Sequence, residues 1–181
     1  MHARLAVIVC TALFAAGCSQ SPSGGGATSG TVPQSAQTTM DQRFAAEAAS
    51  MGLNEVAVGQ MAAERGATPE IRAFGQHLAQ EHGRNNDRLM GAAKQAGVAV
   101  PTRPDSEEIA KMDKLDDLTG PAFDRAFVNQ MVADHQEAVR LFQQQANQGS
   151  APSLRSYASQ TLPRLQDHLA QAQALARRQG S

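Results

Sequence analysis

The sequence has little of several residue types, and each shortage narrows what the protein can be. Aromatic residues make up 4% of the chain, Trp is absent and β-branched residues are scarce, so the composition disfavours β-strands. The net charge is −1 and no basic run carries interleaved aromatics, which excludes a nucleic-acid partner. No Gly-rich phosphate loop, nucleophile elbow or cysteine cluster supports nucleotide chemistry or nucleophilic hydrolysis. The abundant residues, Ala, Gln, Leu and Glu, favour helices, and a length of 181 residues favours one domain.

Residues 1–18 resemble the signal peptide of a bacterial lipoprotein. A positively charged start precedes an apolar run of 12 residues, 5–16, and small residues lead to Cys18. This run is too short to span a bilayer as a mature helix, which needs about 20 residues. The resemblance implies cleavage before Cys18, lipidation of that cysteine and, from Ser19, sorting to the outer membrane. A secreted protein cut nearby and an uncleaved anchor are the alternatives.

Residues 19–39 form a stretch of 21 residues without one charge, rich in Ser, Gly, Gln, Thr and Pro. Such a segment cannot bury enough apolar surface to offset its loss of conformational entropy, so it predicts a flexible tether. Its root-mean-square reach is about 25 Å. The folded domain, residues 40–179, is therefore expected to lie close to the membrane surface.

Apolar residues recur at steps of three and four in the folded part, which predicts four long amphipathic helices. Their expected bounds are Met40–Arg65, Pro69–Ala96, Pro121–Gln148 and Pro152–Arg178. A short fifth helix, Ser106–Leu118, is expected in the connection between the second and third, with Ser106 as its cap. The fold class is thus all-α, a bundle of two helical hairpins joined by a long connection.

The two predicted hairpins share a sequence pattern. Residues 69–74 and 152–157 have Pro, an aliphatic residue, Arg and an aromatic residue at the same offsets, 83 positions apart. The connection of residues 98–120 is longer than a bundle turn and long enough to cross the length of a helix. Crossover and up-and-down topologies both remain open.

Ionisable residues interrupt the apolar seam once in each long helix. They are Glu55, His82, His135 with Asp134 beside it, and His168. All lie near mid-helix, and at 1.5 Å rise per residue their levels agree within about 6 Å. Helical bundles build metal sites from inward-facing side chains of this kind.

Three imidazoles and a carboxylate suit one Zn, Fe or Cu ion. The expected metal residues are therefore Glu55, His82, Asp134, His135 and His168. Acids that directly precede a histidine could orient neighbouring imidazoles or add oxygen ligands: Glu81, Asp134 and Asp167. The alternative is a buried hydrogen-bonded network that fixes helix register and binds nothing. His77, among arginines on the polar side, is expected to be solvated surface.

Several of these residues also carry a family resemblance. The matching elements are Phe44, Asn54-Glu55, Glu81-His82, Phe123-Asp124, Asp134-His135 and the segment 163–168. They resemble a bacterial envelope family known as a domain of unknown function and often described as outer-membrane proteins. The resemblance implies a ferritin-like four-helix bundle and no established activity. The Glu-x-x-His motifs of di-iron proteins are absent, since Ala79 and Leu165 stand three residues before the relevant histidines.

The sequence therefore predicts a lipid-anchored, periplasmic protein of the outer membrane that binds a transition metal for sequestration or a stress response. Its one expected partner is the membrane, through the lipid; protein partners are open. A metal-free structural or interaction module of the envelope is the alternative. A metal-dependent oxidase is a second alternative, but it needs more carboxylates than the seam offers.

Overall fold

A computed structural model describes residues 39–179, and these residues contain five helices and no strand. The helices are α1 (Met40–Arg65), α2 (Pro69–Ala96), α3 (Ser106–Asp116), α4 (Gly120–Gln148) and α5 (Pro152–Gln179). The predicted all-α bundle of two hairpins, α1–α2 and α4–α5, is confirmed. The predicted signal peptide with Cys18 and the tether up to residue 38 lie outside the described residues.

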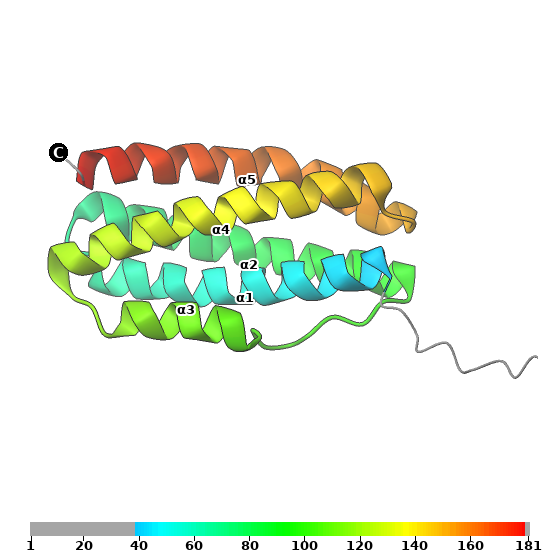
Figure 1. Cartoon of the computed structure of the whole chain (residues 1–181), viewed down its shortest axis with the longest axis horizontal. Helices are drawn as coiled ribbons and strands as arrows, with labels where there is room; N and C mark the ends of the chain where they lie inside the picture. The colour runs from blue at the N-terminus through cyan, green and yellow to red at the C-terminus, as the bar shows by residue number, and fades with distance from the viewer. Residues whose placement is uncertain (1–38, 180–181) are drawn as a thin grey trace, which may run out of the picture. The chain divides into compact units, whose positions relative to one another are not determined.

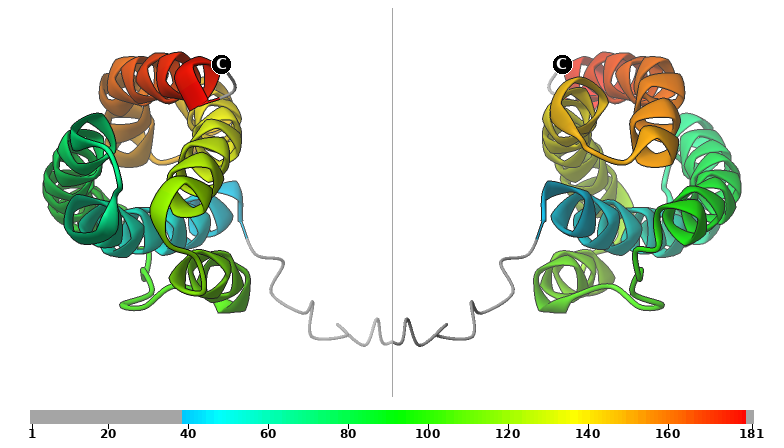
Figure 2. Two further views of the ribbon diagram at one scale, coloured as in Figure 1. Left: turned by 90° about the vertical axis from the view of Figure 1, so that its left-hand side faces the viewer. Right: turned by 90° about the vertical axis from the view of Figure 1, so that its right-hand side faces the viewer.

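Four long helices form the bundle, and each packs antiparallel to its neighbours (Figure 1). The α1–α2 hairpin lies against the α4–α5 hairpin through contacts of α1 with α4 and of α2 with α5. The connection from α2 runs back along the bundle, so α4 starts at the opposite end from where α2 finishes (Figure 1). The topology is therefore a crossover. The connection carries α3, which packs outside the four helices against α1 and α4 (Figure 2).

Local sequence sets the helix ends. Thr39, the last residue of the predicted tether, is the N-cap of α1 and forms a capping box with Gln42. Gly97 ends α2 in the left-handed conformation, with φ of 67°, which glycine adopts without strain. The expected cap of α3 is wrong by one residue: the carboxylate of Asp105 accepts the first backbone N–H bonds, so Ser106 is already helical.

The 83-residue offset extends to the contacts that close the two hairpins. Asp124 of α4 accepts hydrogen bonds from the backbone N–H groups of Ala67 and Thr68, in the turn between α1 and α2. Asp41 of α1 lies 83 positions earlier and accepts from backbone N–H groups 150 and 151, in the turn between α4 and α5. Each hairpin therefore holds the turn of the other.

Arginines and aromatic rings follow the same offset. Arg72 and Arg155 each donate to two backbone carbonyls of their own turn. Two matching aromatic pairs have ring centroids 6.1 Å apart: Phe44 with Tyr157, and Phe127 with Phe74. The fold thus has an approximate internal twofold repeat, as the short sequence match suggested.

The core consists of two apolar clusters separated by a polar layer. One cluster centres on Phe44, Phe142 and Tyr157, and the other on Phe123 and Phe127. Each long helix contributes to both clusters and has an ionisable residue between its two contributions. Among residues 39–179, no helix combines the length and apolar character that crossing a membrane requires.

Candidate metal centre

The polar layer contains four of the five metal residues expected from the sequence. Glu55 comes from α1, His82 from α2, His135 from α4 and His168 from α5. Their exposed fractions are 2%, 3%, 0% and 4%. We call these four residues the histidine cluster. The amphipathic pattern of the helices brings them together, because each occupies a seam position at mid-helix.

The three imidazoles form a compact triangle. Ring centroids are 5.5 Å apart for His82 and His135, 5.2 Å for His82 and His168, and 5.3 Å for His135 and His168. One ring nitrogen from each histidine lies within 4.8 Å of the others. The shortest approach, 3.3 Å, joins Nε2 of His135 to Nδ1 of His168. A metal ion that draws three nitrogens to about 2.1 Å requires only small side-chain movements from this starting point.

Glu55 lies behind two of the imidazoles. Its Oε2 is 2.9 Å from Nδ1 of His82, and its Oε1 is 3.3 Å from Nδ1 of His135. Nδ1 of His135 is also 3.0 Å from the Met131 carbonyl, which only accepts hydrogen bonds. Both Nδ1 atoms therefore carry the proton, and the Nε2 lone pairs of His82 and His135 are left for other partners. This carboxylate–histidine pairing is how proteins orient imidazole ligands toward a metal.

Burial keeps the imidazoles of His135 and His168 neutral. It lowers the pKa of His135, against the attraction of Glu55. Burial, followed by repulsion from His82 and His135, lowers the pKa of His168 to about 3. Burial alone would raise the pKa of Glu55, but attraction to His82 and His135 outweighs it and lowers that pKa to about 2. Neutral imidazoles beside one carboxylate anion are the protonation state in which these side chains bind a cation.

Two buried atoms of the histidine cluster have no hydrogen-bond partner among the described residues: Nε2 of His82 and Oε1 of Glu55. Leaving a buried polar atom unpaired costs about 1–3 kcal/mol, so such atoms are rare in folded proteins. A cation bound to Nε2 of His82 would supply its missing partner.

Asp134, the fifth expected metal residue, faces a different partner. Its carboxylate lies 3.1 Å from Nζ of Lys111 on α3, which also contacts Glu108 at 2.7 Å. Burial and the negative charge of Glu55 raise the pKa of Asp134 to about 6, against the attraction of Lys111. Adjacent helical residues point about 100° apart, so Asp134 turns toward α3 when His135 turns into the core.

The acids expected to orient imidazoles are engaged elsewhere or exposed. Glu81 pairs with Arg84 and Arg164 at the surface. Asp167 is exposed on α5. His77 is exposed, as expected, but the structure adds a contact that the sequence did not indicate: its ring lies edge-on to His168, with centroids 5.3 Å apart.

The sequence matches a known protein family. Residues 27–175 match the family described as a domain of unknown function, DUF4142. The chain belongs to this family. The match spans the whole histidine cluster, so the resemblance expected from the Glu81-His82 and Asp134-His135 pairs is confirmed. No curated protein matches this DUF4142 chain.

A solved structure supports the helical fold of the DUF4142 chain. It is the DUF305 protein of Streptomyces coelicolor, which is described as secreted. The two chains superpose with a TM-score of 0.62 and 16% identity, covering 79% of this chain and 97% of the other. At this identity the likeness concerns the fold alone. The chemistry of the DUF4142 chain is therefore argued from its own residues.

Proposed function

We propose that this protein binds one transition-metal ion in the histidine cluster and sequesters it in the bacterial cell envelope. The ligands are His82, His135 and His168, with Glu55 as the acceptor that orients His82 and the Met131 carbonyl as the acceptor that orients His135. Zn, Fe and Cu all accept imidazole nitrogen. Three nitrogen ligands leave a coordination position for water or a carried ligand.

The observation that carries the proposal is the grouping of three buried imidazoles, with one nitrogen of each within 4.8 Å of the others. A lone buried histidine is commonly satisfied by a neighbouring carbonyl or carboxylate. Here Nε2 of His82 has no partner, although the other nitrogen of that ring is held by Glu55. Such an arrangement is costly without an ion and favourable with one.

The internal repeat gives independent support. Each cluster residue has a counterpart 83 positions away that lacks its chemistry: Ala138 for Glu55, Leu165 for His82, Gly52 for His135 and Asn85 for His168. The hairpin architecture is thus built twice, and at the counterpart positions it is built without these ionisable groups. Fold stability alone gives no reason for four of them at one level.

The envelope location rests on two observations. The sequence up to Cys18 resembles a lipoprotein signal peptide. The structurally similar Streptomyces protein is described as secreted, which supports a location outside the cytoplasm. An outer-membrane lipoprotein exposed to the periplasm satisfies both.

A metal-free structural module is the rival function, and specific contacts favour it. Glu55 already pairs with His82 at 2.9 Å, and His135 already approaches His168 at 3.3 Å. A buried network of this kind can fix the register of four helices without a ligand. The two functions differ in metal content.

The test is elemental analysis of the purified full-length chain beside a variant that keeps the fold. His82→Leu/His168→Asn uses residues that the repeat already accommodates at Leu165 and Asn85. Asp134→Asn is the matched control, because Asp134 lies outside the histidine cluster. Far-UV circular dichroism checks that all three chains are equally helical.

We expect one metal ion per chain in the wild type and the control, and none in the double variant. Bound metal adds RT ln(1 + [L]/Kd) to stability, about 2.7 kcal/mol at a hundredfold excess over Kd. A wild type without metal, and without a thermal shift on adding zinc, iron or copper, would leave the structural module as the function.

A further inference from the structure

The histidine cluster approaches the protein surface between α2 and α5. His168 lies at the edge of a surface pocket of about 380 Å³, together with His77, Glu81, Arg164, Asp167 and Gln171. On the opposite side, His135 is fully buried, and α3 packs over α1 and α4 (Figure 2). The groove between α2 and α5 is therefore the short route from solvent to the imidazoles.

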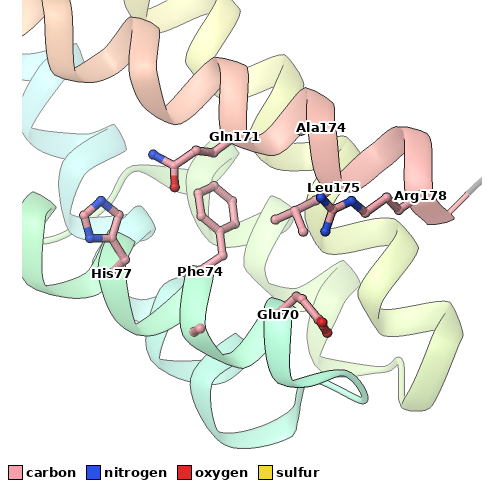
Figure 3. Close-up of a pocket in the computed structure, with 8 residues that line it drawn as sticks. Glu70, Phe74, His77, Gln171, Ala174, Leu175 and Arg178 are labelled. Carbon is pink, nitrogen blue, oxygen red and sulfur yellow. The ribbon is translucent and has the colours of Figure 1, made fainter.

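His77 lies where two surface pockets of this groove meet. A second pocket of about 380 Å³ continues the groove toward the start of α2 and the end of α5, and it shares His77 and Gln171 with the first. Figure 3 shows His77 rising from α2 and Gln171 reaching from α5, with the ring of Phe74 between His77 and Leu175. His77 is thus open to solvent on one side and in contact with His168 on the other.

The spacing of His77 and His168 matches the spacing inside the histidine cluster. Their ring centroids are 5.3 Å apart, within the range of 5.2 to 5.5 Å among the three buried imidazoles. Yet His77 does not belong to the group whose nitrogens lie within 4.8 Å of one another. Its position suits a ligand that holds a metal next to the site and not within it.

One acidic side chain of the groove is free to meet a cation. Asp167 is exposed and has no ion-pair partner among residues 39–179, so its carboxylate is available beside His77. Glu81 is held by Arg84 and Arg164. Beneath the Glu81–Arg164 ion pair, a narrow cavity of about 10 Å³ lies next to His82 and His168.

We infer that the metal enters and leaves the histidine cluster through the α2–α5 groove, with His77 as a transit ligand that passes it to His168. This inference rests on the proposed metal site. A metal ion held by His77 is at a high local concentration next to His168, which speeds its capture by that residue. His77 contacts the metal only while the metal is in transit, and not in the fully bound protein. It therefore changes the rates of uptake and release by the same factor and leaves the dissociation constant unchanged.

The experiment follows Co²⁺, whose visible absorption reports coordination, in the full-length chain. Stopped-flow mixing measures uptake, and mixing of the loaded protein with excess chelator measures release. His77→Ala is compared with wild type and with Gln76→Ala, an exposed neighbour on α2 that lines neither pocket. A separate equilibrium titration gives stoichiometry and affinity.

We expect His77→Ala to bind one Co²⁺ with unchanged affinity, while uptake and release both slow by about tenfold. Gln76→Ala should match the wild type. Unchanged rates in His77→Ala would overturn the transit role and leave the site intact. Loss of affinity with unchanged uptake would also overturn it, because His77 would then be a resident ligand. Failure of the wild type to bind Co²⁺ would instead refute the proposed metal site.

Discussion

The carboxylate of Glu55 faces the protonated nitrogens of two imidazoles, so it acts on a bound metal through those rings. Replacing it with Gln keeps the size and removes the charge. We expect Glu55→Gln to retain one metal per chain and to weaken binding by about 10- to 100-fold, the usual effect of losing an orienting acceptor. Competition with a chromophoric chelator measures the affinity.

Asp134→Asn is the matched control for that experiment. Asp134 has a similar burial, but its partner is Lys111 on α3. Its substitution should leave metal affinity within a few-fold of wild type. Equal losses in the two variants would mean that the binding depends on the overall negative charge of the region and not on the orientation of His82.

Buried neutral histidines make the stability of the metal-free protein depend on pH. The pKa of His168 is lowered from 6.5 to about 3 and that of His135 is lowered too, so the unfolded chain takes up their protons first as the pH falls. Stability is therefore lost below about pH 6.5. Glu55, with its pKa lowered to about 2, adds a loss only below 4.5, whereas the raised pKa of Asp134 opposes the loss below about 6.

Between pH 6.5 and 4.5, Asp134 contributes equally to two proteins that both contain it. A difference between their stability profiles in this range therefore reports the imidazoles. Urea unfolding with chelator present should show that wild type loses more stability across this window than His168→Asn. The difference approaches about 1.4 kcal/mol per pH unit for one imidazole. Parallel pH profiles for the two proteins would show that His168 is not buried in its neutral form.

Seam spacing predicted that these four residues face the interior of the bundle, and the structure places them there, because a helix of known period fixes which residues share a face. The same period explains why Asp134 faces another partner: neighbours in sequence cannot both point inward. The proximity of His77 to His168 was not predictable, because it depends on the crossing of α2 and α5. That relation between helices has no signal in either helix alone.

Helix packing at the element scale depends on one close approach between α1 and α2. A Cβ on Gly75 would lie 2.6 Å from the backbone carbonyl oxygen of Gly59, and backbone cannot move aside as a flexible side chain does. We expect Gly75→Ala to destabilise the protein by about 1–3 kcal/mol, because the two helices must separate. Urea denaturation followed by circular dichroism gives the value.

Gly91→Ala, in the same helix, is its control. A Cβ there meets nothing within 4 Å, so the substitution should stabilise the protein by about 0.5–1 kcal/mol through helix propensity. Opposite signs for the two substitutions separate packing from propensity. A stabilising Gly75→Ala would contradict the close helix crossing.

The two aspartates that hold the turns make a second element-scale prediction. Asp124 and Asp41 each accept two backbone N–H bonds from the opposite hairpin. Asp124→Ala and Asp41→Ala should each cost about 2–4 kcal/mol, since charge-assisted bonds are lost and donors are left unpaired. Exposed Asp87→Ala should cost under about 0.5 kcal/mol. A neutral result at either turn would mean that water replaces the carboxylate there.

Helix boundaries were largely predictable because helix-starting and helix-ending residues mark them: Pro69, Pro152 and the glycines that follow the helices. The predicted starts and ends agree with the structure within two residues. The packing of α3 against α1 and α4, and the crossover itself, were not predictable. A 23-residue connection between mid-length helices permits both topologies, and only tertiary packing selects one.

At the scale of the whole molecule, the polar layer does not follow the internal repeat. The twofold arrangement repeats what the fold needs, namely turn contacts, arginine clamps and aromatic pairs. The histidine cluster breaks that repeat, since its counterparts are Ala138, Leu165, Gly52 and Asn85. The repeated contacts therefore belong to the scaffold, and the unrepeated histidine cluster belongs to the candidate site.

The attachment of the molecule to the membrane is the last prediction. Lipidation at Cys18 would retain the protein in the membrane fraction although no helix among residues 39–179 is able to cross a bilayer. Cys18→Ser should therefore move the protein to the soluble periplasmic fraction, whereas Cys10→Ser, within the predicted signal peptide, should not. Density-gradient separation should place the wild type in the outer membrane. A Cys18→Ser protein that stays with the membranes would show that an uncleaved anchor, and not a lipid, holds the bundle there.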